Sequence, residues 1–288
     1  MNHVYTADEW ASLLGQLKAV ELAPASVEGQ AATWEGLMPG EVLATRKSRT
    51  CLAWAGDGRK YVLKVYPDAG RAGREAGVMA WLRAGGLTVP APLAVGEHAL
   101  LREFVEGTSL KQMSDSDLVE TCAQLGRWLR RCHEIGADHP AAGRDAGATW
   151  LVGDMNFGNY VVGTADFLLW GIDFGDTRMG DAYDDVGEGI MRILIRPPAF
   201  TVLNWEAAVG FIDAYATADA GGSGGPRVTG GEELGPARQR VIPAVQRAFV
   251  QMAAWRHGDA DMLRAADTFP ETWGRVVAAA EKCSMLGM

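Results

Sequence analysis

The chain has 288 residues, which is enough for one large domain or for two lobes with a sizeable core. Its composition, 48% hydrophobic and 22% charged, is ordinary for a soluble globular protein, and no apolar run reaches the length of a membrane span. The net charge of −9, without any basic block, argues against nucleic acid or an anionic membrane as the main partner.

The N-terminal residues carry neither a basic segment nor an apolar run of the kind that directs export. The four cysteines form no metal-spaced pair, so we expect a cytoplasmic protein. Thr6 and Glu9 match a capping box, and apolar residues follow at helical spacing. This pattern predicts a short leading helix whose apolar stripe packs on the body of the protein.

The next part of the chain has the pattern of an antiparallel sheet. Three β-prone runs are predicted to be strands, at residues 41–44, 50–54 and 60–66. The third run alternates, with Leu63 facing one side and Lys64 the other. A helix follows at 71–84, and after an extended connection two further strands are predicted at 93–95 and 99–104.

The C-terminal part is predicted to be mainly helical. A long helix begins after Ser114 or Ser116, and its apolar residues recur at steps of three and four. His133 and His139 have no spaced partner, so surface or capping roles are expected for them. Further helical patterns occupy residues 187–195, 205–215, 241–255 and 270–282.

Residues 150–187 carry the chemistry. Two short β-prone runs, 160–162 and 167–170, are separated by a plausible turn and predict a hairpin. Because a hairpin brings its ends together, Asp154, Asn159 and Asp173 are expected to converge. Two carboxylates and an amide oxygen suit Mg²⁺, which takes its remaining ligands from water and phosphate oxygens. One aspartate would remain free to accept a proton, so the set is suited to phosphoryl transfer.

The order of these motifs resembles the protein-kinase-like superfamily. Asp154-x-x-x-x-Asn159 followed by Ile172-Asp173-Phe174-Gly175 is similar to its catalytic loop and metal-binding motif. The run 180–186, GDAYDDV, resembles a motif of the small-molecule branch, the aminoglycoside and choline phosphotransferase-like kinases. The resemblance implies an α+β, two-lobed kinase-like fold. Its N-terminal lobe, 1–104, would be a small antiparallel sheet with helices, and its C-terminal lobe, 105–288, would be larger and mostly helical.

The resemblance also implies roles for single residues. Lys64, in V-L-K-V, would bind the α- and β-phosphates of ATP, held there by Glu75 of an R-E-A motif. Segment 100–107 resembles the hinge between lobes, where the backbone of Glu103 and Val105 would meet adenine. Asp154 would be the catalytic base. Asn159 and Asp173 would hold Mg²⁺.

Two departures from the family pattern concern the loops. Residues 44–50 lie where a glycine-rich loop would cover the phosphates and contain no glycine, so hydroxyls such as that of Ser48 would hold them instead. Val152 stands where the family has a histidine that steadies the catalytic loop.

Asp181 and Asp185 are expected to tie that loop to the next helix by accepting backbone N–H bonds.

Three functions remain open at this stage. A kinase that phosphorylates a hydroxyl of a small molecule is favoured by the run 180–186 and by the helical C-terminal third. A lipopolysaccharide sugar kinase is favoured by the triplet Asp154-Met155-Asn156, and a non-catalytic nucleotide-binding pseudokinase by the two departures.

Overall fold

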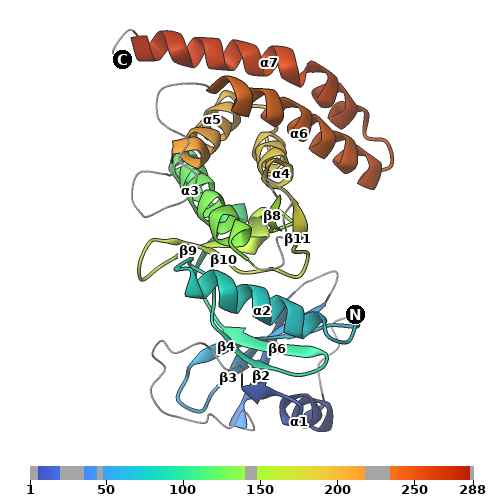
Figure 1. Ribbon diagram of the computed structural model, residues 1–288. Helices are drawn as coiled ribbons and strands as arrows, with labels where there is room; N and C mark the ends of the chain where they lie inside the picture. Colours follow the sequence, from blue (N-terminus) through green and yellow to red (C-terminus); the bar gives the residue numbers. More distant parts are fainter. Residues whose placement is uncertain (1–5, 20–35, 44–47, 140–147, 218–233, 286–288) are drawn as a thin grey trace. The chain divides into compact units, whose positions relative to one another are not determined.

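The computed structural model describes residues 6–19, 36–43, 48–139, 148–217 and 234–285, which form two compact units (Figure 1). The first unit consists of Met1–Gly107 and Val161–Thr177, and the second of Thr108–Tyr160 and Arg178–Met288. The chain therefore returns to the first unit for a short segment after the predicted catalytic loop. The predicted lobes, 1–104 and 105–288, do not include this return.

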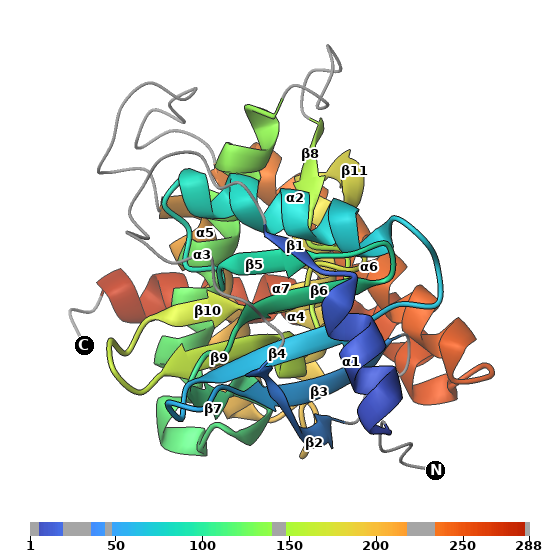
Figure 2. The same cartoon turned by 90° about the horizontal axis from the view of Figure 1, so that it is seen from below.

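The first unit is built on a six-stranded antiparallel sheet with strand order β1-β5-β6-β4-β3-β2 (Figure 2). Its strands are β1 (Lys18–Ala19), β2 (Met38–Leu43), β3 (Arg49–Trp54), β4 (Lys60–Val65), β5 (Pro92–Val95) and β6 (Ala99–Glu103). Helix α1 (Ala7–Gly15) begins with the predicted capping box at Thr6 and Glu9. Helix α2 (Arg71–Ala84) contacts β5 and β6.

The two faces of the sheet have different surroundings. On one face, Leu63 of β4 joins Trp10 and Leu14 of α1 in a buried apolar cluster. On the other face, Lys64 meets Glu75 of α2. The alternation predicted for this strand is confirmed. Because neighbouring residues of a strand face opposite sides, Leu63 lies in an apolar core and Lys64 in a charged cluster.

The predicted hairpin is present in the segment that returns to the first unit. Strands β9 (Tyr160–Gly163) and β10 (Leu169–Gly171) lie in a three-stranded sheet of order β10-β9-β7, with β7 at Gly107–Ser109. The Gly163 N–H donates to the Leu168 carbonyl at 2.9 Å and closes the turn. Thr88 donates its hydroxyl to the Leu169 carbonyl and accepts from the Gly171 N–H, which fastens β10 to the connection after α2.

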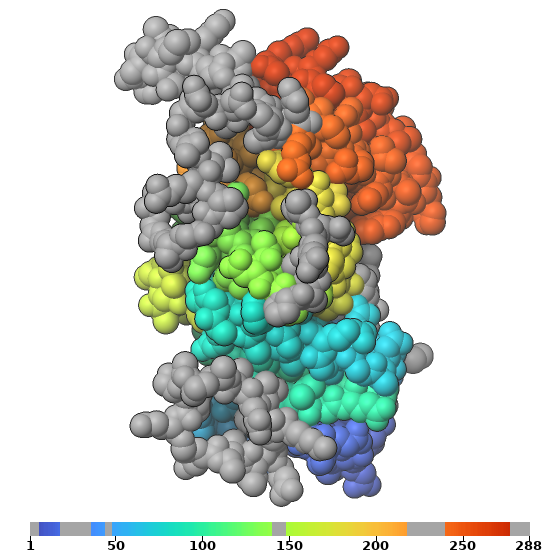
Figure 3. Space-filling view, in the orientation of Figure 1, coloured from blue at the N-terminus to red at the C-terminus, as the bar shows by residue number. Residues whose placement is uncertain are grey.

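The described part of the second unit is mainly helical. It contains α3 (Leu118–Ala137), α4 (Ala182–Leu194), α5 (Val202–Thr217), α6 (Leu234–Trp255) and α7 (Ala260–Met285), with a short sheet of β8 (Ala148–Leu151) and β11 (Arg178–Asp181). Helix α3 packs on α5, and α4 packs on both α5 and α6. Helix α6 also packs on α7, and the visible surfaces of these two helices are orange and red in Figure 3. The antiparallel-sheet and helical parts confirm the predicted fold class. None of the helices in the described ranges is both long and apolar enough to cross a membrane.

Helices α3 and α5 approach closely at Gly126. A Cβ atom at this position would lie 2.2 Å from the carbonyl oxygen of Phe211, which belongs to the backbone of α5 and cannot rotate away. The apolar stripe of α3 that surrounds this contact is buried, with Cys122, Leu125 and Leu129 all fully covered. Glycine at position 126 therefore sets the distance between the two helices.

We expect Gly126→Ala to lower the free energy of unfolding by about 1–3 kcal/mol, because the added methyl group must push α5 away from α3. Gly77→Ala is the matched control, since Gly77 is an exposed position of α2 with nothing within 4 Å of its would-be Cβ. There the alanine should be neutral or stabilise by up to about 1 kcal/mol. Denaturant unfolding of both variants measures the difference, and equal stabilities would contradict the close packing.

Candidate active site

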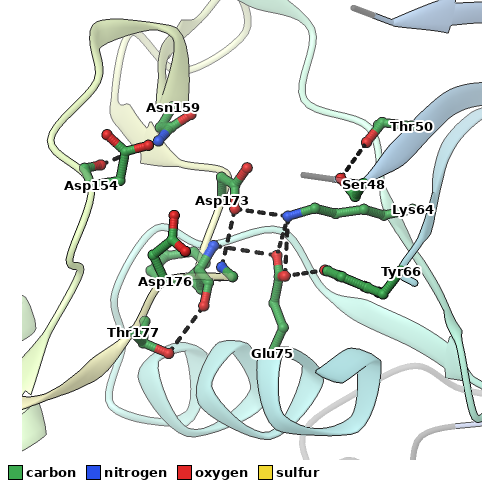
Figure 4. Close-up of polar contacts among 12 residues, drawn as sticks. Ser48, Thr50, Lys64, Tyr66, Glu75, Asp154, Asn159, Asp173, Asp176 and Thr177 are labelled. Atoms are coloured by element: carbon green, nitrogen blue, oxygen red, sulfur yellow. Dashed lines mark hydrogen bonds and ion pairs between the residues drawn. The ribbon is translucent and has the colours of Figure 1, made fainter. Parts of the chain in front are cut away.

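Lys64 of β4 and Glu75 of α2 form a buried ion pair (Figure 4). The Nζ atom of Lys64 lies 3.1 Å from each carboxylate oxygen of Glu75. The two side chains are only 6% and 1% exposed, so neither charge is compensated by water. The Tyr66 hydroxyl donates a further hydrogen bond to Glu75. The pairing of Lys64 with Glu75 that the resemblance implies is therefore present.

Asp173 completes this charge cluster in the first unit. Its Oδ1 atom lies 2.7 Å from Lys64 Nζ and accepts a hydrogen bond from the Gly175 N–H at 3.0 Å. The Phe174 N–H donates to Glu75 Oε1 at 3.2 Å, which ties the loop after β10 to α2. A Cβ at Gly175 would come within 3.1 Å of Glu75 Oε2, so a glycine leaves room for the cluster.

The electrostatics keep Asp173 ionised. Burial opposes its charge, but the Lys64 ammonium, the Gly175 N–H and the Arg102 guanidinium together hold the pKa of Asp173 below its ordinary value. Lys64 and Gly175 both use Oδ1, so Oδ2 is left as a metal ligand among the described residues. These residues contain no group of three or more His, Cys, Asp or Glu side chains that could hold a metal ion. One carboxylate oxygen fits Mg²⁺, which takes most of its ligands from phosphates and water.

The predicted hinge residues follow β6. The Glu103 N–H is already used by the Ala91 carbonyl at 2.9 Å, and the Glu103 carbonyl accepts from Arg102 Nη1 at 3.0 Å. Within the part of the chain that the structure describes, the N–H of Val105 makes no hydrogen bond. The described donor for a base at this hinge is therefore the backbone of Val105.

Ser48 immediately precedes β3, and its Oγ is 3.3 Å from the Thr50 hydroxyl (Figure 4). Thr50 is the register partner of Lys64 in the β3–β4 ladder, so these hydroxyls lie along the strand beside the lysine. Thr45, Arg46 and Lys47 of the predicted phosphate-covering loop lie outside the described residues.

Asp154 and Asn159 are held together in the second unit. The Asn159 side-chain nitrogen donates to the Asp154 carbonyl at 3.2 Å, which leaves the amide oxygen as the ligand atom (Figure 4). The carboxylate of Asp154 accepts from the Asn156 N–H at 3.1 Å. Asn156 in turn caps the short helical turn Phe157–Asn159 by accepting from the Gly158 N–H.

Asp185 of α4 holds the start of the catalytic loop, as predicted. Its carboxylate accepts from the Val152 N–H at 2.6 Å and from the Gly153 N–H at 3.0 Å. It also contacts His133 Nε2 at 3.1 Å, while His133 Nδ1 lies 2.9 Å from the Tyr215 hydroxyl. The prediction of a surface or capping role for His133 is wrong, since this side chain is 5% exposed and sits between two polar partners.

The prediction for Asp181 is also corrected. Asp181 caps α4 by accepting from the Tyr183 N–H at 3.0 Å, and it pairs with Arg240 at 2.8 Å. It therefore fixes the start of the helix, while Asp185 fixes the loop. Asp181 and Asp185 are four positions apart in the same motif, and only the folded backbone distinguishes their partners.

Two charged residues of α4 beside Asp154 were missed by the sequence analysis. Arg192 Nη2 lies 3.3 Å from Asp154 Oδ1 and 2.8 Å from Glu188 Oε1. Burial raises the pKa of Glu188, although Arg192 opposes the shift. Their i, i+4 spacing just after the motif was the available signal.

The predicted site residues thus form two sets. Lys64, Glu75 and Asp173 meet in the first unit, together with the hinge, and Asp154 and Asn159 meet in the second. The convergence of Asp154 and Asn159 with Asp173 stays a prediction from the hairpin.

Comparison with known proteins gives a matching family model and several solved structures of similar fold. Residues 41–156 match the model of the phosphotransferase enzyme family, whereas no curated protein matches the sequence. An amicoumacin kinase in complex with AMP-PNP, Ca²⁺ and amicoumacin has a TM-score of 0.57 at 14% identity, with 93% of this chain and 94% of that chain covered.

Two other solved structures are similar. A macrolide 2′-phosphotransferase from Brachybacterium faecium has a TM-score of 0.53 at 16% identity, covering 91% and 97% of the two chains. A Plasmodium vivax ethanolamine kinase has a TM-score of 0.56 at 11% identity, covering 82% and 81%. This chain therefore shares its fold with small-molecule kinases, and the resemblance drawn from the motifs is confirmed.

We expect Asp185→Asn to lower the free energy of unfolding by ~2–4 kcal/mol, because an amide cannot accept from His133 and both loop N–H groups at once. The neighbouring Asp184→Asn is the control. The side chain of Asp184 is 39% exposed and pairs with Arg247, so its loss should cost less than about 1 kcal/mol. Denaturant unfolding compares the two variants. Similar small losses would show that Asp185 does not hold the loop.

Proposed function

We propose that this protein is a phosphotransferase that moves the γ-phosphoryl group of a nucleoside triphosphate to a hydroxyl of a small molecule. The observation that carries the proposal is the buried cluster of Lys64, Glu75 and Asp173 in the first unit. An ammonium held between two carboxylates is a fixed partner for phosphate oxygens, and the second carboxylate keeps an oxygen for a cation. The family match over 41–156 supports the same reading.

In the proposed complex, Lys64 contacts the α- and β-phosphates while Glu75 keeps it in place. Ser48 offers a hydroxyl to the phosphates, and the hinge backbone at Glu103 and Val105 meets the base. Asp173 and Asn159 hold Mg²⁺, which neutralises charge on the phosphates when bound. ATP is the donor predicted from the sequence, and the amicoumacin kinase, solved with AMP-PNP and Ca²⁺, supports nucleotide use.

Asp154 is the proposed base. Its carboxylate orients the acceptor hydroxyl and takes its proton as the new oxygen–phosphorus bond forms. The bond from that phosphorus to the bridging oxygen breaks, and a nucleoside diphosphate leaves. Arg192 restrains one oxygen of Asp154 at 3.3 Å. Catalysis arises mainly from positioning and charge stabilisation.

The acceptor is proposed to be a small molecule and not a protein. Between Asp173 and Asp181 the chain has seven residues, 174–180, too few for a segment that presents a peptide. The similar structures are named as kinases of amicoumacin, macrolides and ethanolamine, which supports a small acceptor.

The two alternatives find less support. The triplet that favours a lipopolysaccharide sugar kinase contains Asn156, whose side chain here caps a helical turn. A pseudokinase is opposed by the intact contacts of Lys64 with Glu75 and Asp173.

Binding of a nucleoside triphosphate with Mg²⁺ should stabilise the protein by about 2.7 kcal/mol at a hundredfold excess over Kd. Thermal unfolding with and without Mg²⁺ measures this. In Asp173→Asn the Mg²⁺-dependent part should disappear, while it should persist in the control Asp176→Asn, a change to a side chain that pairs with Arg71. A melting temperature that no nucleotide changes would contradict the proposed function.

Asp154→Asn should reduce kcat by about 10²- to 10⁴-fold, the range of a general base, and leave nucleotide binding nearly intact. The physical reason is that Asp154 acts on the acceptor, whereas Lys64 and Asp173 hold the donor. Phosphate transfer from labelled nucleotide is measured over sugars, amino alcohols and aminoglycosides, with generic proteins as a comparison panel. Full activity of the variant on an acceptor that the unmodified protein phosphorylates would refute the role of Asp154.

A further inference from the structure

Arg102 is a buried cation to which the proposed function assigns no role in binding or catalysis. Only 6% of the residue is exposed, and within the described ranges it forms no ion pair. Its Nε atom is buried and has no hydrogen-bond partner among the described residues. Burying a guanidinium with an unpaired N–H is costly, so a group that accepts from it is to be expected.

The position of Arg102 in the sheet shows which side it faces. Arg102 is the register partner of Val62, and Leu100 is the register partner of Lys64. Cross-strand partners share a face, so Arg102 lies on the same face as Lys64, away from the apolar cluster of α1. Burial lowers the pKa of Arg102, and the negative charges of Glu75 and Asp173 oppose this shift. Arg102 is therefore part of the environment of the phosphate-binding cluster.

Arg102 also immediately precedes the hinge. Its Nη1 atom donates to the Glu103 carbonyl at 3.0 Å. This carbonyl is the acceptor that the amino group of adenine would need at the proposed hinge. The Arg102 guanidinium therefore places N–H donors at this edge of the proposed base site. A site specific for adenine would present an acceptor there.

The two purines differ at this edge. Guanine carries two acceptors, O6 and N7, whereas adenine carries the N6 amino donor beside N7. A guanidinium binds the guanine pair through two parallel N–H groups, and it meets the adenine amino group donor to donor. The unpaired Nε–H of Arg102 has the chemistry to satisfy one of the guanine acceptors.

We propose that Arg102 selects a purine with an oxygen at C6, so that GTP is preferred to ATP as the phosphoryl donor. The inference rests on the proposed function and refines its donor, since the phosphate and metal ligands are the same for both nucleotides. It assigns Arg102 a specificity-determining role at the base, separate from that of Lys64 at the phosphates.

The test uses four triphosphates with Mg²⁺, and calorimetry measures their Kd values on the full chain. GTP and ITP carry O6, whereas ATP and 2,6-diaminopurine riboside triphosphate carry N6. GTP and ITP should bind about 5- to 150-fold more tightly than the other two, the ratio that one bidentate contact gives. ITP and the diaminopurine nucleotide separate the effect of the C6 group from that of the 2-amino group.

Arg102→Met removes the donors at similar length and should bring the GTP-to-ATP ratio close to one. Arg102→Lys keeps the charge without the two-pronged geometry and should also lose most of the ratio. Arg59→Met, at an exposed turn residue paired with Asp57, is the control and should leave the ratio unchanged. If Arg102→Met does not fold, the lysine variant and the four-nucleotide panel still decide.

The outcomes separate the two levels of the argument. Equal or tighter binding of ATP by the unmodified protein would overturn the inference and leave the proposed function standing. An equal loss for all four nucleotides in both Arg102 variants would also overturn it, since Arg102 would then act on the phosphates or the fold. Failure of every nucleotide to bind would overturn the proposed function and the inference together.

Discussion

The arrangement of the first unit depends on one buried carboxylate, that of Glu75. It receives the Lys64 ammonium, the Tyr66 hydroxyl and the Phe174 N–H, which belong to a strand, its end and the loop after the hairpin. A carboxylate buried to this degree is tolerable only when its lone pairs are occupied by such donors. Removing any one donor therefore affects the positions of the others, so Lys64 and Asp173 are positioned as a set.

The pairing of Lys64 with Glu75 was predicted, whereas the contact of Asp173 with Lys64 was not. Period-two and helical spacing placed Lys64 on a strand and Glu75 on the helix that follows it, and the resemblance to kinases implied that they pair. Asp173 was found from a loop motif after a hairpin whose turn residues are explicit. The strand alternation, the capping box at Thr6 and the α2 bounds were accessible for the same reason, since local backbone preferences determine them.

What escaped prediction depends on contacts between distant segments. His133 has no spaced partner in the sequence because its partners, Asp185 and Tyr215, come from two later helices. Arg102 was included in the hinge without a role, since only the sheet register shows that it faces the side of Lys64. The distinct roles of Asp181 and Asp185 likewise follow from the residue at which α4 begins. The motif alone does not identify that residue.

The contacts of Asp185 also bear on the histidine that the family places at position 152. Asp185 holds the predicted catalytic loop through the main chain, at the N–H groups of Val152 and Gly153. Every amino acid except proline has a main-chain N–H, so this anchor does not depend on the side chain at position 152. A change of side chain at position 152 therefore leaves this anchor in place unless the new residue is proline, which has no N–H to give. Position 153 is different, because its φ of 80° favours glycine. Valine in place of histidine at position 152 therefore leaves the anchor of the loop unchanged. A motif search that requires this histidine would miss a chain with this arrangement.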